Sequence, residues 1–315
     1  MLNRRYLRIK VLQAVYAFFV SGNDDISRGE KELWASVSKT REMYFFLLRL
    51  LTEIHSVVGQ FLEEEKAKNF PGQSEIHTYS RFLSLKPLAQ LAQNSAIEKF
   101  CRENGLSWTE KPEIVRRLAV SFKNSSTREA IHAIEPTDYA GEIKFLIDFY
   151  KEHVVQYEYL ETWFEDKSIY WADEVDFCHA MVMRTLGQFD PQDPKGTTPF
   201  ELYKNEAEDT EFIRDLFRQT LINSEKLEQR ISEKTRNWDV DRIALMDIIL
   251  MKLAITEITH FYNISVKVSL NEYIELSKSF STPRSRVFIN GILDKMVQDL
   301  RRENLVKKVG RGLIE

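Results

Sequence analysis

Four basic side chains lie within the first ten residues, Arg4, Arg5, Arg8 and Lys10, and no acidic residue lies among them. Arg4 and Arg8 are four positions apart, so a helix places them on one side. That side coincides with the apolar stripe of a helix predicted at 4–20, and an arginine is not buried without a partner charge. We therefore expect the first turn to extend beyond the core, with its bases in solvent or on a partner. The pattern fits RNA or another polyanion, and it also fits ordinary solvated charge at a chain end.

Metal chemistry is a second candidate. The pairs Glu129/His132 and Glu257/His260 share the Glu-x-x-His spacing that di-metal helical bundles use in two of their four helices. Such a site also needs two inward-facing Glu residues on two further helices. The acids of this chain are predicted to face outward, and His260 falls at a helix end. Two chance matches are expected in a Glu-rich chain, so we predict no metal site.

Motifs of catalysis are missing from the sequence. It contains no Gly-rich phosphate loop and no G-x-S-x-G, H-E-x-x-H or C-x-x-C motif. Cys101 and Cys178 lie far apart in the sequence. We expect both to be reduced core residues of a cytoplasmic protein. The opening segment lacks the form of a secretory signal, because Gln13 interrupts its apolar part. We therefore predict a cytoplasmic protein that is not an enzyme, binds no cofactor and does not enter a membrane.

Helices are the elements that would position these residues. The chain of 315 residues has only 11 Gly and 8 Pro, and few turns combined with long periodic apolar runs predict an all-α fold. The segment DPQDPKGTTP (190–199) is the clearest break. Apart from the C-terminal segment, the predicted helices cover 4–20, 29–66, 86–104, 112–122, 126–134, a long stretch from Thr137 to about Phe164, 172–187 and 209–236.

The C-terminal segment contains the element around which a bundle would form. Residues 238–258 are apolar nearly all round, which is typical of a central helix. Asp247 and Lys252 interrupt the run, so it is not a membrane span. Ser269 and Glu272 have the spacing of a capping box for the next helix.

Thr282 and Pro283 are the expected N-cap and first residue of the last helix. Gly291 lies inside that helix, where either a close approach of another backbone or simple tolerance explains it.

Charge is unevenly distributed along the chain. Residues 135–176 hold twelve acids and three bases, whereas residues 301–315 hold five bases and two acids. The net charge of -4 therefore conceals a basic end that attracts phosphate and an acidic middle that repels it.

Both ends of the chain resemble the NusB family of transcription antitermination factors. The segment RRYLRIKVLQAVYAFF (4–19) resembles the family's arginine-rich opening helix, with Gln13, Ala14 and Tyr16 at signature positions. The likeness covers about residues 1–20 and 209–300. Within 266–295, the residues that fall in register with the family pattern are Asn271, Glu272, Glu275, Leu276, Lys278, Phe280, Ser285, Phe288, Asn290, Gly291, Leu293 and Asp294.

The resemblance implies an RNA-binding protein. Family members are all-helical proteins that bind the boxA RNA of ribosomal RNA operons, usually with a small-subunit ribosomal protein (NusE), in a complex that helps RNA polymerase read through terminators. The implied RNA-binding residues are Arg4, Arg5, Arg8, Lys10, Lys267, Ser285 and Arg286. The implied structural motif residues are Gln13, Tyr16, Asn271, Glu272, Phe288, Asn290 and Gly291.

The resemblance also implies a domain organisation. We expect a NusB-like helical bundle formed by 1–20 plus 206–303, a large inserted acidic helical domain at 21–205, and a basic tail at 304–315. Pro283 and Arg284 replace an acidic pair of the family pattern, which leaves the contacts of that pair in doubt. The alternatives are a helical protein-interaction scaffold or an accessory of ribosomal RNA maturation without sequence-specific RNA binding. A homodimer is a further alternative, because some relatives self-associate.

Overall fold

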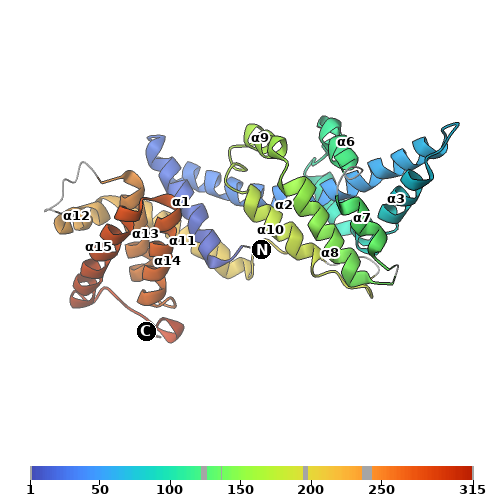
Figure 1. Ribbon diagram of the computed structural model, residues 1–315. Helices are drawn as coiled ribbons and strands as arrows, with labels where there is room; N and C mark the ends of the chain where they lie inside the picture. The colour runs from blue at the N-terminus through green and yellow to red at the C-terminus, as the bar shows by residue number, and fades with distance from the viewer. Residues whose placement is uncertain (1, 122–125, 136, 194–197, 236–242, 314–315) are drawn as a thin grey trace. The chain divides into compact units, whose positions relative to one another are not determined.

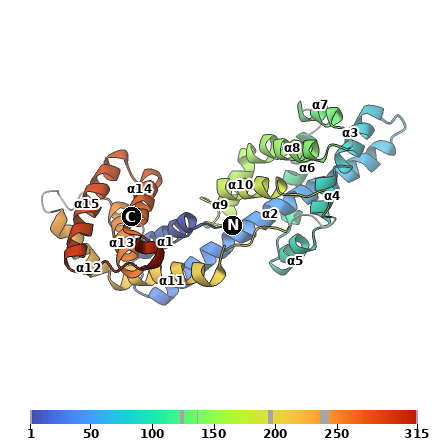
Figure 2. The ribbon, with the colours of Figure 1, turned by 90° about the horizontal axis from the view of Figure 1, so that it is seen from below.

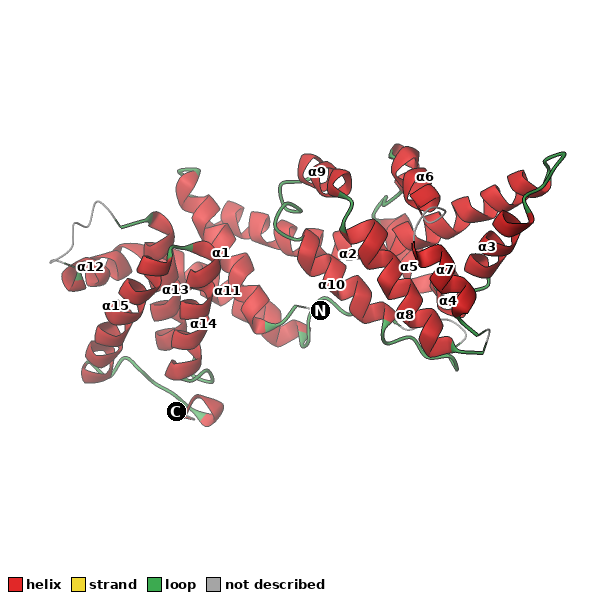
Figure 3. Ribbon diagram, in the orientation of Figure 1, coloured by secondary structure: helices red, strands yellow, loops and turns green. Residues whose placement is uncertain are grey.

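The computed structural model describes residues 2–121, 126–135, 137–193, 198–235 and 243–313. Within these ranges the protein consists of fifteen α-helices and short helical turns, without a strand, which confirms the all-α prediction (Figure 3). The chain divides into two compact units. Unit 1 comprises residues 1–37 and 202–315, and unit 2 comprises residues 38–201.

Unit 1 is formed by helices from both ends of the chain. These are α1 (Arg4–Val20), the first part of α2 (Ile26–Lys66), α11 (Glu206–Ile222), α12 (Ser224–Lys234), α13 (Leu245–His260), α14 (Val266–Phe280), α15 (Pro283–Arg302) and the turn η5 (Gly310–Leu313).

Helix α13 is the centre of unit 1, as its apolar sequence predicts. It packs against α1, α11, α12, α14 and α15, as Figures 1 and 2 show from two directions. Most of its residues are buried, including Leu250, Leu253 and Ile258. Within the described residues the helix begins at Leu245, with Ala244 as its N-cap. Residues 238–242 of the predicted helix lie outside the described residues.

Unit 2 contains the remaining part of α2 and the shorter helices. These are α3 (Gln73–Leu83), α4 (Lys86–Ala92), α5 (Ser95–Glu103), the turn η1 (Trp108–Glu110), α6 (Pro112–Ser121), α7 (Ser126–Ala133), α8 (Tyr139–Phe149), the π-helical turn η3 (Tyr150–Val155), α9 (Glu158–Lys167) and α10 (Val175–Leu186).

Aromatic side chains form the core of unit 2. The rings of Phe46 and Trp108 stack with 4.2 Å between their centroids, and Trp108 Nε1 donates to the Phe46 carbonyl. Trp171 packs on the same ring, and its Nε1 donates to the Lys39 carbonyl. Cys101 and Cys178 are buried and unbonded to each other.

Several helix boundaries differ from the prediction. Asn94 caps α5 by accepting from the backbone of Ala96 and Ile97, which splits the predicted helix 86–104 into α4 and α5. Asp138 caps α8 as expected, but the helix stops at Phe149 and does not reach 164. The predicted helix 209–236 is two helices, α11 and α12, and α3 was not predicted at all.

One helix of the described chain, α2, is long and apolar enough to cross a membrane by length and composition. The core helix of a soluble protein passes the same test, and 56% of the apolar window of α2 is buried within the protein.

Candidate nucleic-acid interface

The arginine-bearing turn of α1 lines an open groove of about 1430 Å³ in unit 1. The other walls are α11 as far as Gln219, the loop between α13 and α14, the first two turns of α14, and the C-terminal residues Val309 and Arg311. Asn3 starts α1 by accepting from the backbone N–H of Tyr6, which directs the first turn into this groove.

The side chain of Arg8 is buried in the floor of the groove, with an exposed fraction of 3%. Its Nε and Nη2 donate to the two oxygens of Glu257 at 2.8 and 2.7 Å. Ser269 Oγ and Tyr273 OH donate to the same carboxylate at 2.7 and 3.1 Å. Four donors therefore satisfy a carboxylate that has no access to solvent.

The contacts with Glu257 shift the pKa values of Arg8 and Tyr273. Burial alone would lower the pKa of Arg8, but the hydrogen bonds and charge of Glu257 outweigh it, so the pKa of the guanidinium is raised. Burial raises the pKa of Tyr273 well above its ordinary value, and the Glu257 carboxylate raises it further. Arg8 is thus a permanent cation whose charge is neutralised inside the protein.

Arg5 and Arg4 lie nearer to solvent and are also paired. Arg5 Nε and Nη2 donate to the two oxygens of Glu272 at 3.0 and 2.7 Å, and the bond from Arg5 lowers the pKa of that carboxyl. Arg4 Nε lies 3.1 Å from Asp209 Oδ1, and its guanidinium lies over the ring of Phe212. The side chain of Arg5 is half exposed, so its pairing is the kind that a phosphate can replace at little cost.

The partners of these arginines lie in a segment with known relatives. Residues 180–298 match the model described as the NusB family. We call residues 180–298 the NusB family domain after the model that they match. Each of the three curated relatives below is named "Transcription antitermination protein NusB".

The relative from Salinibacter ruber is 41% identical over 33% of this chain and 65% of its own length. The relative from Chloroherpeton thalassium is 34% identical over 33% of this chain and 50% of its own length. The relative from Natranaerobius thermophilus is 37% identical over 29% of this chain and 66% of its own length. The matches therefore span between one half and two thirds of these relatives. No solved structure matches the chain.

The NusB family match contains the acids but not the arginines. Glu257 and Glu272 lie within 180–298, whereas Arg5 and Arg8 lie at the other end of the chain. The ion pairs between α1 and the helices α13 and α14 therefore connect the arginine motif to the NusB family domain.

Two expectations about the basic turn are wrong. Arg8 does not project into solvent, because Glu257 supplies a buried partner charge. Lys10, predicted to bind RNA, is 1% exposed, and its Nζ donates to the Ser36 carbonyl at 3.4 Å. A lysine that is buried in this way does not reach a ligand in the groove.

The expected capping box is also wrong. Helix α14 begins at Val266, with Ser265 as its N-cap. Ser269 and Glu272 therefore lie inside the helix, where they bind Glu257 and Arg5.

The structure does not bring every predicted RNA-binding residue into the groove. Lys267 and Arg286 are exposed, and neither lines the groove. Ser285 lies in the first turn of α15, where its N–H donates to Thr282 Oγ1. This contact confirms Thr282 as the N-cap and Pro283 as the first residue of α15.

The structural motif residues have mixed environments. Tyr16 is 39% exposed rather than buried in the core, whereas Gln13 and Phe288 are half-buried. Asn271 and Asn290 are exposed, and Asn290 donates to Asp294 on the next turn of α15.

Gly291 faces open space, since a Cβ at this position would meet nothing within 4 Å in the described protein. The structure therefore favours tolerance of glycine over a close backbone approach within this chain.

The Glu-x-x-His pairs do not form a metal site. Among the described residues, no group of three or more His, Cys, Asp or Glu side chains could hold a metal ion. The carboxylate of Glu257 is occupied by Arg8, and His260 Nδ1 lies beside the Thr256 carbonyl. The expectation that the acids face outward is wrong for Glu257, which is fully buried.

Sequence reasoning missed Glu257, Tyr273 and Asp209 as partners of the arginines. One signal was available, because a charged residue in the middle of an apolar helix needs a partner. Glu257 lies in the central apolar run and Arg8 lies on the apolar stripe of the first predicted helix, so each of them needs an opposite charge.

Proposed function

We propose that the chain is a cytoplasmic, RNA-binding transcription antitermination factor of ribosomal RNA operons, without catalytic activity of its own. In this role it binds boxA-type single-stranded RNA together with a small-subunit ribosomal protein (NusE), as part of an RNA polymerase antitermination complex. The observation that carries the proposal is the docking of the arginine motif of α1 onto the NusB family domain through Arg5–Glu272 and Arg8–Glu257.

The groove has properties suited to a single-stranded nucleic acid. Arg4 and Arg5 lie at its rim, where phosphate can exchange with their carboxylate partners. Phe212 lines the groove beneath Arg4, which gives aromatic surface near the backbone contacts. Arg8 binds Glu257 in the floor of the groove, so its role is to hold α1 and the other arginines in position.

The domain organisation is part of the same proposal. We assign 1–20 plus 206–303 to the NusB-like bundle, 21–205 to an inserted acidic domain and 304–315 to a basic tail. The family match begins earlier, at residue 180 in α10. The acidic middle then serves as a spacing or protein-binding element rather than an RNA surface.

Binding of labelled boxA-type RNA and of a scrambled RNA at about 50 and 200 mM salt tests the proposal, with and without the ribosomal protein. The test variant is Arg5→Ala, because Arg8→Ala would also damage the core. The matched control is Arg218→Ala, which has a similar exposed fraction (47% against 50%), pairs with Glu30 and does not line the groove.

We expect wild type and Arg218→Ala to prefer boxA. Arg5→Ala should bind more weakly, with a salt slope smaller by about 0.7 for one lost phosphate contact. Absence of any preference for boxA, even with the ribosomal protein present, would contradict the proposal. That result would favour the alternative of a helical interaction scaffold or an accessory of ribosomal RNA maturation. Sedimentation of the same samples distinguishes a monomer from a homodimer.

A further inference from the structure

The chain that follows α15 turns back over the loop between α13 and α14. We call residues 305–313 the strap. The backbone N–H of Val309 donates to the Tyr262 carbonyl at 2.9 Å, and Lys308 Nζ donates to the Phe261 carbonyl at 2.9 Å. Gly312 is buried so close to the loop that a Cβ would overlap the Tyr262 carbonyl oxygen. Two hydrogen bonds and one close approach thus fix the strap on the NusB family domain.

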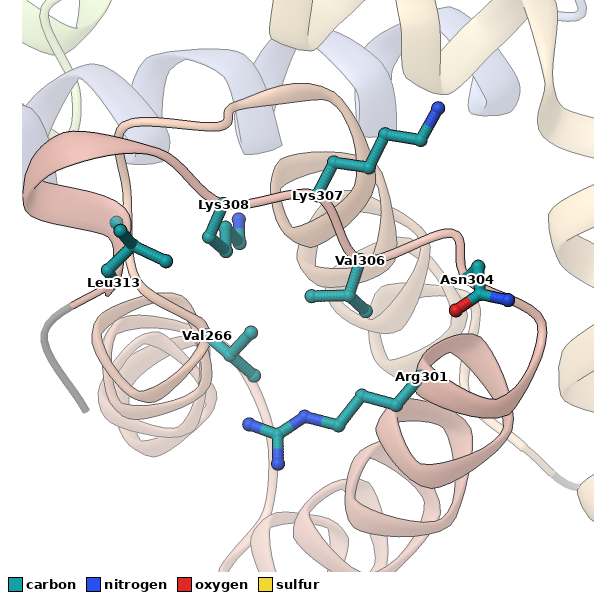
Figure 4. A pocket seen from close by; sticks show the side chains of 8 residues that line it. Val266, Arg301, Asn304, Val306, Lys307, Lys308 and Leu313 are labelled. Carbon is teal, nitrogen blue, oxygen red and sulfur yellow. The ribbon is translucent and has the colours of Figure 1, made fainter.

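The strap separates two hollows of unit 1. Val309 and Arg311 line the groove of α1. Lys307, Lys308 and Leu313 line a second hollow of about 620 Å³, which we call the C-terminal pocket. Its other lining residues are Val266, Arg301, Asn304, Val306 and Gly312 (Figure 4).

The two hollows differ in charge. The residues that line the groove include five bases and five acids: Arg4, Arg5, Arg8, Lys204 and Arg311 against Glu208, Asp209, Glu211, Asp215 and Glu272. The C-terminal pocket is lined by three bases, Arg301, Lys307 and Lys308, and by no acid among the described residues. Burial lowers the pKa of Lys308 to about 8, so most of this cation stays charged at neutral pH. A polyanion in the pocket would therefore meet basic lining residues, whereas one in the groove would meet equal numbers of bases and acids.

The geometry of the pocket suits a flexible strand. Figure 4 shows the side chain of Arg301 extending from α15 toward Val266, across the hollow from Lys308. Leu313 is 67% exposed, and with Val266 and Val306 it offers apolar surface beside the cations. Cations beside apolar contacts are what a single strand needs to hold its phosphates and cover its sugars or bases.

We propose that the C-terminal pocket binds backbone phosphates of the same single-stranded RNA, so that a strand in the groove continues over the strap into the pocket. This inference rests on the proposed function. The strap lies beyond residue 298, where the family match ends, so the contact would be an addition to the NusB family domain. It would place phosphates beside the three basic residues of the pocket, whereas the groove is lined by acids and bases in equal number.

The test compares a short boxA-type RNA with the same RNA extended by a run of uridines at either end, on the full-length protein. The variant is Arg301→Gln/Lys307→Gln, and Lys307→Arg serves as a charge-preserving variant. The control is Lys226→Gln/Lys295→Gln, which removes the same charge from exposed positions of α12 and α15 outside both hollows.

We expect the extended RNA to bind wild type, the control and Lys307→Arg alike. For Arg301→Gln/Lys307→Gln we expect a loss of affinity on the order of tenfold at about 0.1 M salt, and a salt slope smaller by about 1.4 for two contacts. The short RNA should bind all four proteins equally.

Failure of this inference is distinguishable from failure of the proposed function. If boxA preference persists but Arg301→Gln/Lys307→Gln matches the control on extended RNA, the pocket is not a phosphate site and the proposed function stands. If boxA preference is absent while the loss in Arg301→Gln/Lys307→Gln is present, the pocket is a phosphate site and the proposed function is wrong. If neither is observed, both are wrong.

Discussion

Arg8 on α1 and Glu257 on α13 are 249 positions apart in the sequence, yet they form a two-point ion pair from which solvent is excluded. The pair joins the first helix of the chain to the central helix of unit 1. Ser269 and Tyr273 of α14 complete the hydrogen bonds of the carboxylate, so three helices meet at one charge.

Removal of Arg8 should destabilise unit 1 strongly. In Arg8→Met the carboxylate of Glu257 keeps its buried charge without a counter-ion, which typically costs about 3–5 kcal/mol. Arg5→Ala breaks a half-exposed pair and should cost about 1 kcal/mol or less. Urea unfolding of the two variants measures both values.

The double variant Arg8→Met/Glu257→Gln separates charge from packing. It removes the uncompensated charge, so it should be more stable than Arg8→Met alone. Equal stabilities of the single and double variants would show that lost packing, not charge, dominates.

Gly312→Ala should release the strap without unfolding the domain. The added methyl group would overlap the Tyr262 carbonyl oxygen, so the strap must move away from the loop. Hydrogen exchange of the Val309 amide, which donates to that oxygen, should accelerate, while the amides of α13 should keep their protection. Unchanged exchange at Val309 would mean that the strap absorbs the methyl group in place.

Gly291→Ala should stabilise the protein. Gly291 lies inside α15 with open space where the methyl group of alanine would lie, and alanine is about 1 kcal/mol better than glycine in a helix interior. The midpoint of thermal unfolding should rise. A fall would indicate that another molecule, or another copy of the chain, approaches this backbone.

Acid should destabilise unit 2 through His179. Burial lowers the pKa of this ring to about 4, below the ordinary value of roughly 6.5, and Tyr150 OH lies 2.7 Å from its Nδ1. Between these two values the unfolded chain binds the proton and the folded chain does not, so stability falls as the pH falls. The full window corresponds to about 3 kcal/mol.

Denaturant unfolding at several pH values between 7 and 4, followed by the tryptophans of unit 2, measures this dependence. His179→Gln should reduce it, because glutamine does not titrate. His260→Gln is the control, since His260 is exposed in unit 1. Equal pH dependence in wild type and His179→Gln would assign the effect to other groups.

The features that the sequence predicts well depend on residues close together in the chain. The apolar run of α13 identifies the central helix, and Thr282-Pro283 identifies the start of α15, because each signal lies within one element. The split of 86–104 at Asn94 was missed because an asparagine is compatible with both a helix interior and a cap.

The candidate site was predicted less well, since its chemistry depends on distant partners. A helical wheel places Arg8 on the apolar stripe but does not show that Glu257 lies opposite. Ser269 and Glu272 match a local capping pattern, yet both bind residues of other helices. Lys10 was assigned to the RNA-binding site because it lies near the arginines in the sequence, but in the folded protein it is buried.

The separation of Arg8 from Glu257 has a consequence during protein synthesis. A ribosome adds roughly 5–20 residues per second, so α1 leaves it about 12–50 seconds before its partner on α13 is made. Until then the apolar face of α1, with Leu7, Val11 and Val15, has no α13 to cover it. The first helix therefore stays without this cover while the residues of unit 2 are translated.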